Sequence, residues 1–281
     1  MPTEAELRHE VRQFLESLPA LLADSDDPLE RARIYLRARF DAGLGALDYP
    51  TAHGGRDLPR DLVVAYRQET SGRVPDEAGF GIGISMCLPT IRDHGSNELK
   101  ERFLRPGLRG DEIWCQLYSE PGAGSDLAGL ATRAVRDGDD YVINGSKRFI
   151  TGADTADFFQ VVCVTDPEKG TRGGISCIIV DADTPGVKIL RKQQTMMDDQ
   201  PCEMAFDDVR VPVSNLIGNE GDGFRMAQAW ITMCRIRHGA IGIGAMERSL
   251  ELGASYAKDR VTFGKPLADR QAIQWMLVDT Y

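Results

Sequence analysis

Residues 114–126 read Trp-Cys-Gln-Leu-Tyr-Ser-Glu-Pro-Gly-Ala-Gly-Ser-Asp, and the pattern of the chain changes at this stretch. Before it, apolar residues recur at helical spacing. After it come short β-branched runs bounded by glycine and proline, which favour strands. Its glycine-rich end, taken alone, is a generic turn. We therefore expect a helical domain over residues 1–112 and a β domain that begins at residue 113.

The N-terminal side of this boundary carries the signals of several helices. Thr3 and Glu6 have the spacing of a capping box. The apolar residues that follow form one stripe at helical spacing, beginning at Leu7. Further helices are expected over 29–40, from Asp61 onward, over 80–93 and over 97–108. Residues 1–112 therefore predict an all-helical unit.

The strongest strand signal after the boundary lies at residues 141–151. Tyr-Val-Ile is followed there by Asn144-Gly145 and then by Lys-Arg-Phe-Ile-Thr. Because Asn-Gly suits the positive φ angles of a type I′ turn, we expect a β-hairpin that turns at these two residues. Other short strands are expected at 158–164, 175–180, 186–190, 203–206 and 209–212. Together they predict a barrel-like or sandwich β domain over residues 113–220.

The helical pattern returns after residue 220. Residues 224–258 contain no proline and predict one long helix, and a shorter helix is expected from near Leu267. The order of helices, then strands, then helices indicates segregated layers, so the predicted fold class is α+β. Residues 221–281 are expected to be the start of a C-terminal helical-bundle domain that is incomplete.

The composition excludes several classes of protein. The 281 residues carry 33 Lys and Arg against 43 Asp and Glu, a net charge of −10 that argues against a nucleic-acid or anionic-membrane surface. No apolar run approaches the roughly 18 residues that a membrane span needs. The six cysteines form no CxxC pair and the four histidines no HxH or HExxH, so no metal site is expected. With an acidic N-terminus that lacks a signal-peptide pattern, we expect a cytoplasmic protein.

Three glycine or serine motifs of well-known enzymes are incomplete. The segments 79–83 and 242–244 do not finish a GxGxxG and do not follow a strand, which argues against a Rossmann site. No Gly-Lys-Ser/Thr follows the glycines at 122 and 124, so there is no P-loop. A GxSxG is also missing, which leaves a Ser-His-Asp hydrolase without support.

The stretch at 114–126 closely resembles the first signature of the acyl-CoA dehydrogenase family. The resemblance continues through 141–151, through 206–212 with 218–224, and through 259–265 with 269–271. It implies a flavoprotein oxidoreductase that uses FAD to remove two hydrogens from the α and β carbons of an acyl-CoA thioester. The product would be a trans-2-enoyl-CoA, and the electrons would pass to an electron-transfer flavoprotein.

The resemblance assigns cofactor contacts to the first signature. The backbone of Gln116 and Tyr118 and the hydroxyl of Ser119 would face the flavin ring, where donors offset the negative charge that a reduced flavin gathers. Gly124 and Ser125 would line a loop that approaches phosphate groups. Ser125 would also contact the substrate.

Two residues near the end of the second motif would complete the flavin site. Thr151 matches a family hydroxyl near the reactive flavin nitrogen. Phe149 stands where many members carry a tryptophan that shields the flavin face, so an aromatic wall is kept without the indole N–H.

The last motif implies contacts with a second subunit. Arg260 matches a family arginine that meets the FAD pyrophosphate, with Thr262 and Phe263 beside it. In the family these residues, together with Gln271, reach the cofactor of a neighbouring subunit, which implies a homodimer or homotetramer. Arg235 falls near a family arginine on the CoA side and is a candidate substrate contact.

No catalytic residue is expected within the chain. The family's base is a glutamate late in the C-terminal domain, which would lie beyond Tyr281. Some members place it immediately before the arginine that matches Arg235, and that position is Cys234 here. The chain ends inside an apolar-periodic helix without a C-cap. We therefore expect a fragment that alone binds FAD poorly and turns over no acyl-CoA.

Two other functions stay open at this point. The first keeps the fold but changes the chemistry, to an acyl-CoA oxidase or a flavin monooxygenase of the same superfamily. The intact loop at 120–126 favours a CoA thioester over the monooxygenases. The second is a non-catalytic flavin-binding subunit of a heteromeric complex, because the position of the base is not visible.

Overall fold

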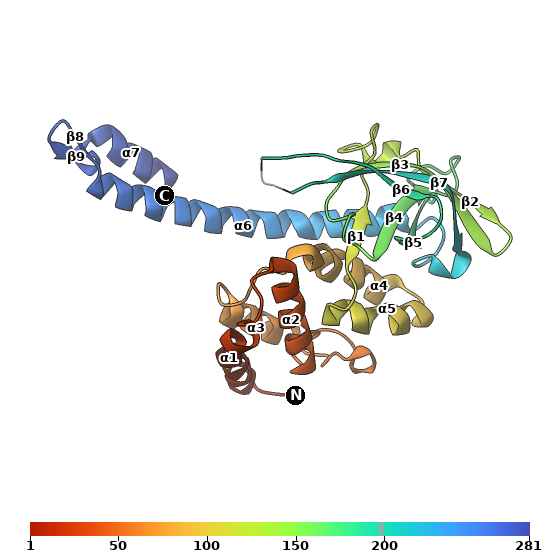
Figure 1. Cartoon of the computed structure of the whole chain (residues 1–281), viewed down its shortest axis with the longest axis horizontal. Coiled ribbons are helices and arrows are strands. Elements are labelled where there is room, and N and C mark those ends of the chain that lie inside the picture. Colours follow the sequence, from red (N-terminus) through yellow and green to blue (C-terminus); the bar gives the residue numbers. More distant parts are fainter. Residues whose placement is uncertain (197–198) are drawn as a thin grey trace. The chain divides into compact units, whose positions relative to one another are not determined.

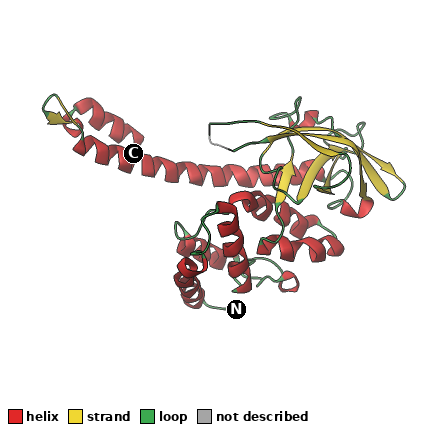
Figure 2. Ribbon diagram, viewed as in Figure 1, coloured by secondary structure: helices red, strands yellow, loops and turns green. Residues whose placement is uncertain are grey.

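The structure is a computed structural model that describes residues 1–196 and 199–281. It divides into two compact units, Met1–Met226 and Ala227–Tyr281. The first unit contains a group of helices followed by a β-sheet, and the second is mainly helical (Figures 1 and 2). The predicted α+β class, with helices before and after a middle β region, is confirmed. The predicted domain boundaries after residues 112 and 220 stay predictions.

Five α-helices precede the sheet, and short helical turns connect them. The α-helices are α1 (Glu4–Leu21), α2 (Pro28–Asp41), α3 (Arg60–Thr70), α4 (Leu88–His94) and α5 (Asn97–Arg109). The short turns are η1 (Thr51–His53), η2 (Ala78–Phe80) and η3 (Gly83–Cys87). The predicted capping box is confirmed, because the Thr3 hydroxyl accepts from the Glu6 N–H and the Glu6 carboxylate accepts from the Thr3 N–H.

The helix expected over 80–93 is interrupted. Its middle, Gly83–Cys87, is a π-helical turn in which the Leu88 N–H donates to the Gly83 carbonyl, and α4 begins only afterwards. Pro89 has no N–H to continue the usual ladder, so a regular α-helix does not run through this point. Gly83 also lies against Trp114, where a Cβ atom would come within 3.0 Å of the indole's Cβ.

The described residues of the middle region form a seven-stranded sheet. Its strands are β1 (Trp114–Leu117), β2 (Arg133–Asp137), β3 (Asp140–Ile150), β4 (Phe158–Val164), β5 (Ile175–Asp181), β6 (Val187–Lys192) and β7 (Cys202–Pro212). The strand order is β1-β4-β2-β3-β7-β6, and β5 pairs with β4. β1 runs parallel to β4, whereas β3 and β7 pair antiparallel. An aromatic cluster of Phe103, Trp114 and Phe158 packs α5 against β1 and β4.

The predicted hairpin turn at Asn144-Gly145 is wrong. Residues 140–150 form one continuous strand, and the turn lies earlier, between β2 and β3, at residues 137–140. Asn144 is used instead as a cross-strand partner, because its side chain donates to the Asp208 carboxylate and accepts from the Asp208 N–H. Gly145 is needed for a close approach, since a Cβ there would lie 2.5 Å from the Thr132 hydroxyl oxygen.

The second unit is built on the predicted long helix. This helix, α6 (Gly223–Asp259), begins at the end of the first unit and is followed by a small hairpin of β8 (Val261–Thr262) and β9 (Lys265–Pro266). A short turn, Leu267–Asp269, follows the hairpin, and after the extended Arg270 the last helix is α7 (Gln271–Thr280). Among the described residues no helix combines the length and the apolar character that crossing a membrane requires.

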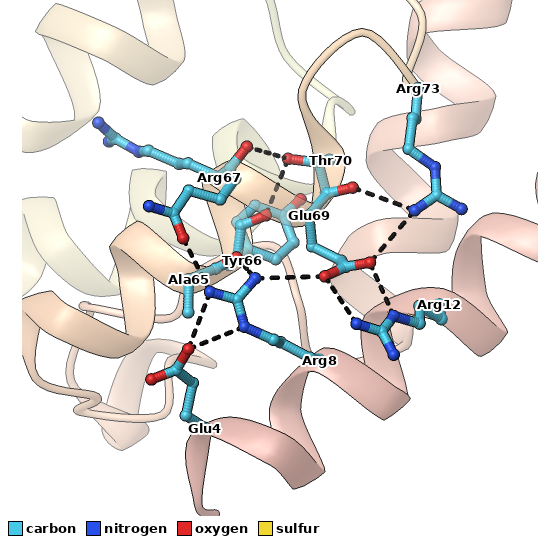
Figure 3. A network of polar contacts seen from close by, with 10 residues as sticks. Glu4, Arg8, Arg12, Ala65, Tyr66, Arg67, Glu69, Thr70 and Arg73 are labelled. Carbon is cyan, nitrogen blue, oxygen red and sulfur yellow. Dashed lines mark hydrogen bonds and ion pairs between the residues drawn. The ribbon is translucent and has the colours of Figure 1, made fainter.

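Charged side chains connect α1 to α3 around one carboxylate (Figure 3). Glu69 of α3 accepts from Arg12 at 2.8 Å and from Arg8 and Arg73 at 3.2 Å each. Arg8 also reaches Glu4, one helical turn earlier, at 2.8 Å. The hydrogen bonds, led by the one from Arg12, lower the pKa of Glu69 to about 2. Glu69 therefore stays ionised and holds two arginines of α1 at the surface of α3.

We expect Glu69→Gln to lower the melting temperature at neutral pH, with a loss that shrinks in acid. The folded pKa of about 2 lies below the ordinary value of 4.5. The stabilisation by ionised Glu69 is therefore complete at pH values above 4.5 and is lost as the pH falls toward about 2. Thermal unfolding followed by circular dichroism from about pH 7 to about pH 3 would measure it. Glu16→Gln, at an exposed site of α1, is the control. A difference independent of pH would contradict the expectation.

We expect Gly145→Ala to destabilise the protein by about 1–3 kcal/mol, because the added methyl group collides with Thr132. Gly81→Ala is the matched control, since a Cβ at Gly81 meets no atom within 4 Å. Urea unfolding at one pH compares the two variants. Equal stability of both variants would show that the close approach at Gly145 does not constrain the sheet.

Candidate functional site

The first signature folds as strand β1 and the loop that leaves it. Gln116 lies in β1, and Tyr118 and Ser119 follow directly, each partly exposed. The loop then closes on itself, because the Glu120 and Ala123 backbones bond reciprocally at 2.8 and 3.2 Å. The Arg148 N–H donates to the Ser119 carbonyl at 2.9 Å. The first and second motifs of the sequence are therefore brought side by side.

A buried ion pair lies beneath this loop. The Lys147 side chain is 0% exposed, and its Nζ is 2.8 Å from Oε1 of Glu120. The ammonium also donates to the Tyr118 carbonyl at 3.1 Å and to the Val162 carbonyl at 2.6 Å. Burial alone would raise the pKa of Glu120, but the charge and hydrogen bond of Lys147 lower it. Burial also lowers the pKa of Lys147, against the opposing effect of Glu120, and the ammonium has an acceptor for each of its three protons.

Phe149 is displayed outward from an irregular part of β3. The register between β3 and β7 shifts between Lys147 and Ile150, which marks a β-bulge. Phe149 has a φ of +59°, a conformation that a bulky side chain rarely adopts. Its ring is 56% exposed, and the Arg148 guanidinium lies 4.8 Å from the ring centroid. The bulge therefore points the aromatic side chain away from the core, with the partly buried Arg148 guanidinium against it.

Thr151 lies directly after β3 and is exposed. Its carbonyl accepts from the Cys115 thiol at 3.0 Å, which connects the end of β3 to β1. Burial raises the pKa of Cys115 to about 12, so this thiol stays protonated and able to donate. Gln116, Tyr118, Ser119, Phe149 and Thr151 are thus held by two segments that are bonded to each other.

Gly124 and Ser125 lie on the exposed part of the loop. A Cβ at Gly124 would meet no atom within 4 Å, so the protein itself leaves this space open. These two residues lie beyond the reciprocal Glu120–Ala123 bonds. Their expected contact with a phosphate or a substrate stays a prediction.

The donors of this region fit the needs of a flavin. Among the described residues, the buried Nε2 of Gln116 has no hydrogen-bond partner. A buried donor without a partner costs free energy in a folded protein, and because this nitrogen has no accessible surface it does not itself reach a ligand. It lies on the strand that carries the partly exposed Ser119 just beyond its end. The residues present are therefore compatible with the flavin edge that the sequence resemblance implied.

The remaining predicted residues lie in the second unit. Arg260, Thr262 and Phe263 surround the β8–β9 hairpin, whose Phe263 is 96% exposed with a φ of +50°. Gln271 is the first residue of α7 and is exposed, and Arg235 is exposed on α6. The structure brings Arg260, Thr262 and Phe263 together within one short segment.

Comparison with known proteins gives three family matches in chain order. Residues 1–111 match the N-terminal domain of acyl-CoA dehydrogenase, residues 115–209 the middle domain and residues 221–281 the C-terminal domain. The chain is 38% identical over 282 residues to the acryloyl-CoA reductase (NADH) of Anaerotignum propionicum, covering 97% of this chain and 70% of that protein. The chain belongs to the acyl-CoA dehydrogenase family.

Other relatives agree with this assignment. The chain is 35% identical over 250 residues to the mitochondrial isobutyryl-CoA dehydrogenase of Dictyostelium discoideum, covering 88% of this chain and 60% of that protein. A crystal structure of acyl-CoA dehydrogenase from Geobacillus kaustophilus superposes with a TM-score of 0.80 at 31% identity, covering 99% of this chain and 74% of that one. The chain thus spans between three fifths and three quarters of the length of these relatives.

The sequence reasoning missed three residues that contact predicted site residues of their own unit. Lys147 was read only as part of a motif, although it supports the whole loop. Arg148 was not singled out, although its backbone holds Ser119 and its side chain covers Phe149. Arg270 donates to the Thr262 carbonyl at 2.7 Å and lies 5.7 Å from the Phe263 ring. The sequence held one signal for Lys147. It lies six residues after Tyr141, and because side chains alternate along a strand, the two point to the same buried face.

No cluster of metal-ligating side chains occurs among the described residues.

We expect Phe149→Gly to be more stable than Phe149→Ala by roughly 1 kcal/mol. Both variants remove the same exposed ring, but only glycine adopts the positive φ of this position without strain. Urea unfolding of the two variants measures the difference. A Phe149→Ala variant as stable as Phe149→Gly would show that the bulge stores no backbone strain.

Proposed function

We propose that this member of the acyl-CoA dehydrogenase family binds FAD and dehydrogenates an acyl-CoA thioester between its α and β carbons. The observation that carries the proposal is the Ser119 loop, which is bonded to the segment that displays Phe149 and Thr151. When bound, FAD would supply the two-electron acceptor that amino-acid side chains lack. The chain's own role would be to donate hydrogen bonds to the flavin edge and to cover one face with Phe149.

The proposed substrate is a CoA thioester. The family and the names of the relatives support this class, and the loop at 120–126 is complete in this chain. Gly124 and Ser125 would approach the phosphate or pantetheine part from the exposed side of the loop, and Arg235 would contact the CoA part. The product would be a trans-2-enoyl-CoA.

The proposed partners are an electron-transfer flavoprotein and further copies of this chain. A homodimer or homotetramer would complete the cofactor site of a neighbour through the exposed Arg260, Phe263 and Gln271 and the partly exposed Thr262. An always-charged arginine suits the FAD pyrophosphate, and an exposed aromatic ring suits a contact with a second molecule. The cytoplasmic location expected from the sequence stays a proposal.

The proton-abstracting base is proposed to lie outside residues 1–281. Removal of the α-proton of a thioester needs a positioned base, for which the family uses a carboxylate. The family's alternative base position is Cys234, a thiol that is partly buried on α6. Residues 1–281 alone should therefore show no acyl-CoA turnover.

We expect the protein expressed from its complete coding sequence to be yellow, and an acyl-CoA to bleach its flavin absorbance under anaerobic conditions. Propionyl-, butyryl- and isobutyryl-CoA are suitable first substrates because related proteins act on short acyl groups according to their names. Free CoA, which has no acyl group, is the matched control and should bleach nothing. A colourless protein that FAD does not reconstitute would overturn the proposal.

The same experiment tests the alternatives. Rapid re-oxidation by oxygen with release of peroxide would favour an acyl-CoA oxidase. Slow re-oxidation, with transfer of electrons to an added electron-transfer flavoprotein, favours the dehydrogenase. A protein that binds FAD but is bleached by none of the thioesters would favour a flavin monooxygenase or a non-catalytic subunit.

A further inference from the structure

The buried pair of Lys147 and Glu120 contacts four separate segments of the chain. Lys147 lies in β3 and reaches Glu120 and Tyr118 of the loop and the Val162 carbonyl of β4. On its other side, the Glu120 carboxylate accepts from the Ala131 N–H at 2.7 Å. It also accepts from the next backbone N–H, that of Thr132, at 3.2 Å. The pair therefore fixes the loop to β3, β4 and the chain before β2.

The position of the pair in β3 connects it with the displayed side chains. Lys147 holds the Tyr118 carbonyl, and the next residue, Arg148, holds the Ser119 carbonyl through its N–H. The residue after that is Phe149, which the bulge turns outward. Three consecutive residues of β3 thus set the path of the loop and the direction of the aromatic ring.

Stability alone does not account for such a pair. Withdrawing two charges from water costs about as much as their attraction returns, so apolar replacements of buried pairs are often neutral or stabilising. An apolar contact is non-directional, however, and would leave the loop free to shift along β3. A salt bridge with its hydrogen bonds specifies one position. A pair of this kind is useful where a site must be shaped before its ligand arrives.

We propose that Lys147 and Glu120 are positioning residues that hold the loop at 116–120 and Phe149 in the arrangement required for the cofactor. The proposal rests on the proposed function, since it presumes that this loop binds FAD. The pair touches neither cofactor nor substrate. It acts through the carbonyls of Tyr118 and Ser119 and through the strand that displays Phe149.

The central test replaces both charges at once, with Lys147→Met and Glu120→Gln in one protein expressed from its complete coding sequence. A double variant avoids leaving one buried charge unpaired, which would unfold the region for a trivial reason. We expect a melting temperature near that of the wild type. FAD should bind at least about tenfold more weakly, because a misplacement of about 1 Å is enough to lose a preorganised site.

A second ion pair with a buried cation supplies the control. Arg39 of α2 is 8% exposed and lies 3.1 Å from Glu77, which is 28% exposed and away from the loop. The Arg39→Met and Glu77→Gln double variant removes this pair, and its FAD affinity should equal that of the wild type. If both double variants bind FAD more weakly in proportion to the stability they lose, Lys147 and Glu120 have only a structural role and the proposal is wrong. Wild-type FAD affinity in the Lys147–Glu120 double variant would also overturn the proposal.

A second variant and a cofactor-free measurement cover the case in which the double variant does not fold. Glu120→Asp keeps the charge but shortens the side chain, and it should weaken FAD binding while leaving the fold intact. Amide hydrogen exchange without FAD should become faster in peptides covering 114–124 and 148–150, and stay unchanged in β7. Uniform exchange in all of these peptides, or unfolding of both variants, would reject the positioning role. If the wild type binds no FAD, the proposed function fails, and the exchange pattern still decides whether the pair positions the loop.

Discussion

The ammonium of Lys147 and the carboxylate of Glu120 meet 2.8 Å apart in the interior of the β region. Each is desolvated, and each is paired by backbone groups from other segments. If only apolar contacts held the first signature, it could follow other paths over the sheet, because the hydrophobic effect depends on the buried area and not on direction. The ion pair removes that freedom. The Ser119 carbonyl, the Arg148 N–H and the outward Phe149 all lie within one or two residues of it.

The same region combines rigidity and strain. The Cys115 thiol donates to the Thr151 carbonyl, and the loop closes on itself between Glu120 and Ala123, so the backbone around the candidate site has few free groups. Against this frame, Phe149 keeps a positive φ and Gln116 keeps an unpaired donor. Costs of this kind persist where the surrounding structure enforces them, and they are concentrated at sites that bind ligands. This is the physical case for a cofactor site that exists before its cofactor binds.

The local sequence predicted much of this architecture. Thr3 and Glu6 specify the start of α1 because a capping box depends only on residues three apart. The strand at 158–164 and the long helix after residue 223 were predicted from composition and period alone. The hairpin at Asn144-Gly145 was not, because turn preference is a local property and was outweighed by two distant contacts. Asp208 occupies the Asn144 side chain, and Thr132 requires Gly145 to lack a side chain.

That error also concealed the most important pair of the site. If the chain turned at 144–145, Lys147 would lie in a different strand from Tyr141, and nothing would place the two side chains on the same face. In one continuous strand both side chains point to the buried face, so the lysine there needs a carboxylate partner. The sequence by itself determined the family, the order of helices and strands, and which segments carry the candidate cofactor residues, because these depend on short motifs and local periods. Only the tertiary structure decided which of those residues are held together, because Glu120 and Lys147 are 27 positions apart and only the folded sheet makes them neighbours.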